Sequence, residues 1–134
     1  MKDLTMFPHR ISFDETKVTE LKPKPSDIPS RYEFWSKDSS PYRVATIDIL
    51  KGNTELSEDL DEVISPGVHT VPEPIDLGNE WLRWDVEQGA IEIKIWTRKL
   101  DDEYICRVVA RFDKENDPLE YKIENMVINI LFDD

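Results

Sequence analysis

Apolar and polar residues alternate most clearly between positions 81 and 100. Two segments of this kind, 81–87 and 90–100, flank Gln88-Gly89, which fits a two-residue hairpin turn. Pairing across that turn places apolar residues opposite one another on three successive rungs: Val86 with Ile91, Trp84 with Ile93, and Leu82 with Ile95. The pattern therefore predicts an antiparallel hairpin with one face in the core.

The alternation continues after Asp101-Asp102 into a third segment, 104–112. This segment also fits a helical period, but a strand register explains more positions at once. The register pairs Thr97 with Cys106, Ile95 with Val108, Ile93 with Ala110, and Ile91 with Phe112. A fourth strand is predicted after Asp117-Pro118, and a change of parity near Glu124-Asn125 indicates a β-bulge or a corner.

The first half of the chain predicts shorter elements. Strands are expected at 32–35 and 42–50, and Pro-containing connections at 22–30 and 72–79. One helix is predicted between a cap at Asn53 or Thr54 and a stop at Pro66-Gly67. Its apolar residues recur at the spacing of one helix face: Leu56, Leu60, Val63 and Ile64.

These elements predict a single domain, 1–134, of the mainly β class. A sheet with one apolar face must bury it against a second layer. We expect an antiparallel β-sandwich or partly closed barrel, with a C-terminal four-stranded meander and one short helix. The alternative is an α+β roll, in which the helix covers the apolar face.

The predicted register also indicates what lies on the opposite face of the meander. Trp81 pairs with Trp96, and Trp96 in turn with Arg107. Basic residues surround the two indoles on the same face: Arg83, Lys94 and Arg111. Clustered Trp and Arg are typical of binding hot spots. The alternative is a structural ladder of cross-strand pairs, or a surface covered by N-terminal residues.

Charge is distributed unevenly along the chain. Residues 1–50 contain eight basic and eight acidic residues, so the net charge of −12 lies entirely in the remainder. Residues 52–93 contain one base, Arg83, and eleven acids. Such a field opposes nucleic acid and anionic membrane and attracts cationic partners. The alternative is that acidity only keeps the protein soluble.

Catalytic, metal and cofactor motifs are not found in the sequence. The four glycines are isolated, and one Cys with two distant His residues does not form a zinc motif. Cys106 is expected in the core, and His9 and His69 are expected to be structural or solvent-facing. A single cysteine excludes an intramolecular disulfide and favours the cytoplasm. The first residues lack the long apolar run of a signal peptide, and the apolar stretches are too short to span a bilayer, so we expect neither element.

We therefore expect a non-enzymatic acidic protein that engages a basic protein partner through electrostatic steering, as an inhibitor, an immunity-type module or a mimic. In this hypothesis Trp81, Trp96 and Arg107 anchor the partner, with Lys94 and Arg111 beside them. Acids of the predicted helix steer it: Glu58, Asp59, Asp61 and Glu62. One alternative is a small-ligand or carbohydrate-binding sandwich or barrel. Another is a structural subunit of a larger assembly, such as a homo-oligomer.

Overall fold

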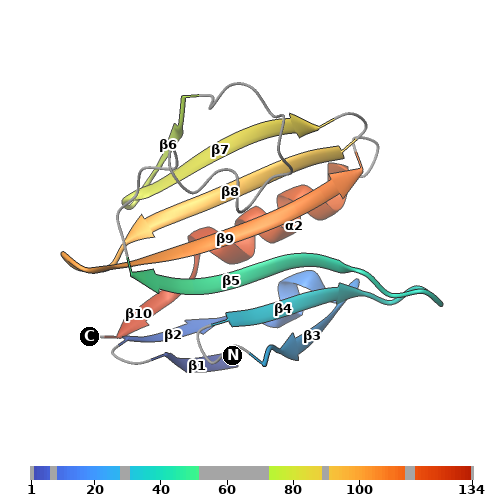
Figure 1. Ribbon diagram of the computed structural model, residues 1–134, viewed down its shortest axis with the longest axis horizontal. Helices are drawn as coiled ribbons and strands as arrows, with labels where there is room; N and C mark the ends of the chain where they lie inside the picture. The colour runs from blue at the N-terminus through green and yellow to red at the C-terminus, as the bar shows by residue number, and fades with distance from the viewer. Residues whose placement is uncertain are drawn as a thin grey trace.

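The computed structural model describes residues 2–6, 9–27, 31–51, 73–88, 91–113 and 117–133 (Figure 1). Within these ranges the chain is mainly β. The strands are β1 (Lys2–Met6), β2 (His9–Phe13), β3 (Leu21–Pro25), β4 (Arg31–Ser36), β5 (Arg43–Lys51), β6 (Ile75–Gly78), β7 (Trp81–Gln88), β8 (Ile91–Lys99), β9 (Tyr104–Asp113) and β10 (Leu131–Asp133). The helical elements are the 3-10 helix η1 (Glu15–Val18) and the α-helix α2 (Asp117–Ile128).

The described strands form two antiparallel sheets. The larger sheet has seven strands in the order β3-β4-β5-β9-β8-β7-β6, and the smaller has three in the order β1-β2-β10. The larger sheet runs from edge to edge without closing on itself within the described ranges. The mainly β, antiparallel fold class is thereby confirmed, in a sandwich-like or roll-like arrangement. Strands β6 to β9 form a four-stranded meander.

Both edges of the larger sheet fall in the segments predicted as Pro-containing connections. Edge strand β3 contains Pro23 and Pro25, and edge strand β6 follows Pro74. Proline cannot donate a ladder hydrogen bond, so it is confined to edge strands and strand starts. The same residues also limit the pairing of an edge with another chain.

The segment predicted as the fourth strand of the meander is instead helix α2. The strand prediction rested on one parity that included Tyr121, which is 70% exposed. The buried residues follow helical spacing instead: Ile123, Met126, Val127 and, just beyond the helix, Ile130. Pro118 in the first turn is compatible with a helix, because the first N–H groups have no intrahelical acceptor. The predicted helix over 56–64 lies outside the described residues.

The register between β7 and β8 differs from the prediction by two residues. Val86 lies opposite Ile93 and Trp84 opposite Ile95. Side chains alternate with a period of two, so a shift of two keeps each residue on its predicted face. The predicted apolar face is therefore present: Leu82, Trp84, Val86, Ile93 and Ile95 pack in one cluster with Val109.

The register between β8 and β9 differs by one residue, which reverses the faces of β9 relative to β8. Thr97 lies opposite Arg107 rather than Cys106. The cause is a longer turn than Asp101-Asp102 predicts, since the last pair is Lys99 with Ile105. The Asp101 carboxylate accepts hydrogen bonds from the backbone N–H groups of Glu103 and Tyr104, at 2.7 and 2.8 Å. These hydrogen bonds from the backbone to a side chain stabilise the longer turn, which contains one more residue than predicted.

The seven-stranded sheet therefore has two distinct faces. The face that packs against α2, the helix face, carries Trp81, Lys94, Trp96, Cys106 and Val108. Figure 1 shows α2 crossing this face behind β8 and β9. The larger apolar core lies here and extends to the smaller sheet, with the rings of Phe13 and Phe34 at 5.8 Å. The opposite face, the outer face, carries the second apolar cluster beside Arg107 and Arg111.

Candidate functional site

The predicted Trp/Arg cluster is divided between the two faces of the sheet. Trp81 and Trp96 share a face as predicted, but they are only 1% and 0% exposed. Their direct cross-strand partners are Arg98 and Arg83, respectively. At this burial the two indoles have almost no surface to offer a partner as anchors. Both rings belong to the core against α2, and Trp96 Nε1 donates to Glu124 Oε1 at 3.2 Å.

Lys94, predicted beside the indoles, is buried and fully engaged by carboxylates. Its Nζ lies 3.0 Å from Asp85, 3.2 Å from Glu92 and 2.6 Å from Glu120 of α2. Burial alone would lower the pKa of the Lys94 ammonium, but the hydrogen bonds that it donates to Glu120 and Asp85 outweigh burial and raise the pKa. Lys94 therefore ties α2 to the sheet and is not a surface anchor.

Arg83 completes this network between the sheet and the helix. Its guanidinium contacts Glu124 of α2, and its Nε lies 2.9 Å from Asp85. Arg107 and Arg111, the other members of the predicted cluster, lie on the outer face because of the one-residue shift. The predicted steering acids lie outside the described residues: Glu58, Asp59, Asp61 and Glu62.

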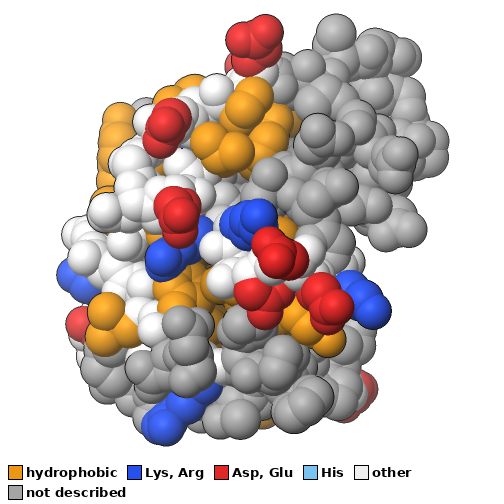
Figure 2. Space-filling model, turned by 90° about the vertical axis from the view of Figure 1, so that its left-hand side faces the viewer, with side chains coloured by type: hydrophobic (Ala, Val, Ile, Leu, Met, Phe, Trp, Pro, Cys, Tyr) orange, Lys and Arg blue, Asp and Glu red, His pale blue; other side chains and the backbone are white. Residues whose placement is uncertain are grey.

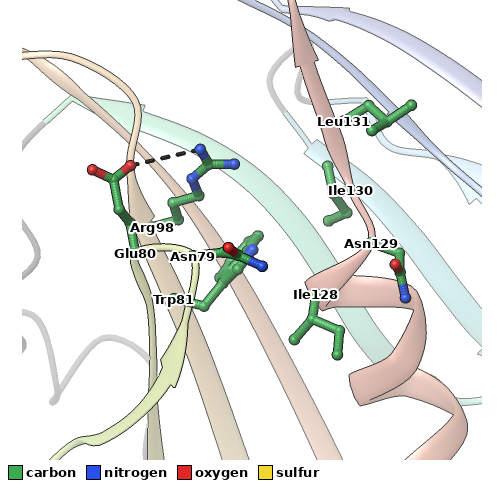
Figure 3. Close-up of a pocket in the computed structure, with 8 residues that line it drawn as sticks. All are labelled: Asn79, Glu80, Trp81, Arg98, Ile128, Asn129, Ile130 and Leu131. Carbon is green, nitrogen blue, oxygen red and sulfur yellow. Dashed lines mark ion pairs between the residues drawn. The ribbon is translucent and has the colours of Figure 1, made fainter.

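A groove not anticipated from the sequence opens at one end of the sheet. Its volume is about 490 Å³, within the range of ligand-binding clefts. One wall is the β6–β7 turn and the other is the connection from α2 to β10 (Figure 3). The lining residues are Asn79, Glu80, Trp81, Arg98, Ile128, Asn129, Ile130 and Leu131.

The β6–β7 wall has an unusual backbone. Gly78, Asn79 and Glu80 have φ values of 84°, 53° and 70°, all in the left-handed region. Glycine tolerates this region and asparagine partly does, but for glutamate it costs roughly 1–2 kcal/mol. The Asp76 carboxylate helps to hold the turn by accepting from Gly78 N–H at 2.8 Å. In this turn the Glu80 side chain lies at the rim of the groove, where it is 72% exposed.

Arg98 connects the two walls of the groove. Its guanidinium lies 4.3 Å from the ring centroid of Phe132 in β10, and its Nη2 lies 3.6 Å from Glu80 Oε2. The Phe132 ring also packs against Trp81, with centroids 6.0 Å apart. Arg98 Nε is buried and has no hydrogen-bond partner in the described part of the chain. The Arg98 side chain as a whole is 26% exposed, and a guanidinium group has five N–H donors, so its outer nitrogens can reach a groove ligand.

The α2–β10 wall is apolar and exposed. Ile128 is 40% exposed and Leu131 is 60% exposed. Asn129 closes the helix end by donating from Nδ2 to the carbonyl oxygen of Asn125 at 2.7 Å. Figure 2 views this end of the molecule and shows exposed hydrophobic side chains among acidic and basic ones. Apolar contacts framed by charge are typical of a protein-binding surface.

The described lining of the groove consists of apolar, amide and charged side chains. Among these eight residues there is no Ser, Cys, Thr or His. Burial raises the pKa of the Cys106 thiol to about 12, which removes its nucleophilic character at neutral pH. No group of three or more His, Cys, Asp or Glu in the described ranges could hold a metal ion.

None of the described helices has the length and apolar character needed to cross a membrane.

Sequence reasoning missed the groove because its walls are distant in the chain and separated by two turns. One signal was available: Gly78-Asn79 marks a tight turn directly before Glu80 and Trp81. The other wall was missed because 119–132 was predicted as a strand instead of a helix followed by a short connection.

Comparison of the sequence with protein-family models and with curated proteins finds no match.

Proposed function

We propose that this chain is a non-enzymatic binding protein that captures a basic segment of a partner protein at the end groove. The observation that carries the proposal is the juxtaposition of exposed Ile128 and Leu131 with the Glu80 carboxylate at one rim. An apolar side chain of the partner fits between the two walls. A Lys or Arg next to it in the partner pairs with Glu80.

The charge of the chain supports a basic partner. The net charge is −12, and residues 52–93 contain eleven acids and one base. At the groove end of the sheet, the β8–β9 turn adds exposed carboxylates at Asp101, Asp102 and Glu103. Long-range attraction of this kind accelerates encounter, and the apolar contacts then hold the complex. The single cysteine favours action in a reducing cytoplasm.

A second candidate function is favoured by Arg98. Its buried Nε lacks a partner among the described residues and lies beside a groove of about 490 Å³. A small ligand with an apolar body and a carboxylate would place the carboxylate on Arg98. A basic protein partner and an acidic small ligand differ in the sign of charge that binds, so the two proposals can be separated directly.

The test is affinity capture from the native host lysate at 50 mM and 500 mM salt, followed by calorimetry with each purified partner. The matched variants are Leu131→Asp in the groove and Tyr121→Asp on the exposed side of α2. We expect a basic protein that is captured at low salt and depleted at high salt. Leu131→Asp should weaken its binding at least tenfold, and Tyr121→Asp should leave it unchanged.

Two outcomes would overturn this proposal. One is a partner that binds both variants equally well, which would place the interface elsewhere. The other is the absence of any salt-sensitive basic partner combined with saturable quenching of tryptophan emission by an acidic small ligand. That result would favour the second candidate, and Arg98→Gln should then abolish the quenching.

A further inference from the structure

The end groove carries one charge of each sign, side by side. Arg98 of β8 and Glu80 of the β6–β7 turn form an ion pair in which Nη2 and Oε2 lie 3.6 Å apart (Figure 3). The Glu80 side chain is largely exposed, and ion pairs at this exposure contribute little to stability. A ligand can therefore replace either member of the pair as the partner of the other at small cost.

Arg98 is positioned by two aromatic side chains. Its guanidinium carbon lies 4.3 Å from the ring centroid of Phe132, and that ring packs against Trp81 with centroids 6.0 Å apart. A guanidinium group stacked on an aromatic face keeps its N–H edge for planar acceptors such as a carboxylate. Among the described residues, Glu80 is the one carboxylate that pairs with Arg98. The outer nitrogens of Arg98 are therefore placed to meet an anion of a groove ligand.

An internal basic segment of a partner protein matches only part of this groove. Its Lys or Arg pairs with Glu80, and its apolar side chain packs between the exposed Ile128 and Leu131. Such a segment brings no anion to Arg98. The C-terminal carboxylate is a negative group that a polypeptide chain can supply however basic its side chains are.

We propose that the segment captured in the groove is the C-terminus of a basic protein. This inference rests on the proposed function, because it assigns which part of the partner the groove takes. The terminal carboxylate binds the Arg98 guanidinium, and an apolar terminal side chain lies between Ile128 and Leu131. A Lys or Arg just before it pairs with Glu80. The exposed Asn79 amide has donors and an acceptor for the backbone of the bound peptide.

The test is calorimetry of the full chain with the peptide acetyl-Gly-Lys-Gly-Lys-Leu, prepared once as the free acid and once as the C-terminal amide. The two probes differ only at the terminal group, where the amide lacks the negative charge. We expect the free acid to bind at least about tenfold more tightly, because the amide cannot form a charge-assisted pair with a guanidinium group.

Variants place the carboxylate at Arg98. Arg98→Gln should bind both peptides as weakly as the wild type binds the amide, so the preference for the free acid disappears. Partial unfolding cannot produce this result, because it would weaken both peptides and keep their ratio. The matched control is Lys99→Gln, which removes a cation at the next position of β8, on the other face of the strand, and should keep the preference. A preference that persists in Arg98→Gln would contradict the assignment.

Other results separate this inference from the proposed function. Equal binding of the two peptides, lost for both in Leu131→Asp, would overturn the inference and leave a groove that captures an internal basic segment. Failure of both peptides to bind at millimolar concentration would also overturn it, whereas a basic protein whose capture Leu131→Asp abolishes would still support the proposed function. Acetyl-leucine that binds as tightly as the free-acid peptide would overturn the assignment of a basic chain end and favour an acidic small ligand.

Discussion

The helix face and the outer face of the sheet both hold ionic groups, but they arrange them differently. In the network that ties α2 to the sheet, Lys94 and Arg83 meet four carboxylates: Asp85, Glu92, Glu120 and Glu124. On the outer face, Arg31 pairs with Asp48 at 2.7 Å and Arg43 pairs with Glu33 at 3.3 Å. The helix network therefore joins a helix to the sheet through shared cations, whereas each of these outer pairs joins two neighbouring strands.

The protonation equilibria show the same contrast. On the helix face, hydrogen bonds to carboxylates overcome the effect of burial and raise the pKa of Lys94, so the charged form is favoured. On the outer face, burial outweighs the Arg31 ion pair and raises the pKa of Asp48, so its charged form is disfavoured. The first arrangement stabilises the fold. The second retains a charge at some cost, which suits a group that positions an arginine.

The largest expected effect is a loss of stability when a core tryptophan is removed, compared with removal of a tryptophan near the surface. Trp96→Ala removes a side chain that is 0% exposed and should lower the free energy of unfolding by about 3–5 kcal/mol. Trp35→Ala removes a half-buried ring that contacts Lys24 and should cost only about 1–2 kcal/mol. Urea denaturation followed by circular dichroism measures both. Equal losses would show that the helix face is no better packed than the edge region.

The next effect tests the ion network of the helix face. Lys94→Met should lower the free energy of unfolding at pH 7 by about 2 kcal/mol, because it removes the cation shared by three partly buried carboxylates. Met fills a similar volume, so lost packing contributes little. A stability increase in the folded variant would mean that desolvation of Lys94 exceeds the gain from its ion pairs.

The same residue predicts a pH dependence with a definite sign. A Lys whose folded pKa is raised contributes stability that is fully present below its unfolded pKa of about 10.5. That contribution is lost as pH rises through the raised folded pKa. The wild type should therefore lose stability above pH 10.5 more steeply than Lys94→Met does, in urea titrations between pH 8 and pH 11.5. Parallel curves for the two proteins would remove Lys94 as the cause.

A smaller effect of opposite sign is expected on the outer face. Since the folded pKa of Asp48 is raised, ionisation of Asp48 reduces stability as pH rises from about 3.8 through the folded pKa. Asp48→Asn still accepts from Arg31 and should raise the free energy of unfolding at pH 7 by less than the Lys94 variant lowers it. The gain should vanish in acid, below the unfolded pKa. A loss at neutral pH would show that the Arg31 pair is a stabilising contact.

The sequence predicts an element correctly where the local pattern of apolar residues fits one type of secondary structure better than another. The strands at 32–35, 42–50, 81–87 and 90–100 were predictable, because their apolar residues form local signals. In 81–87 and 90–100 the signal is alternation, and in 42–50 it is apolar residues on both parities. Helix α2 was predictable in principle from the spacing of Ile123, Met126, Val127 and Ile130. It was missed because the same residues also fit strand parities.

The faces of β9 could not be predicted from apolar pattern alone. Both parities of β9 are largely apolar, with Cys106 and Val108 on one side and Ile105 and Val109 on the other. The choice depends on one residue in the turn, where Asp101 accepts two backbone hydrogen bonds. That single interaction buries Trp96 beside Val108 and moves Arg107 to the outer face.

The central claim is that Lys94 and Arg83 tie α2 to the sheet through shared carboxylates. It can be tested directly by amide hydrogen exchange of the wild type and of Lys94→Met at pH 7. We predict that the variant accelerates exchange of the α2 amides more than exchange of the β5 amides. Equal exchange of α2 in the two proteins would contradict the account.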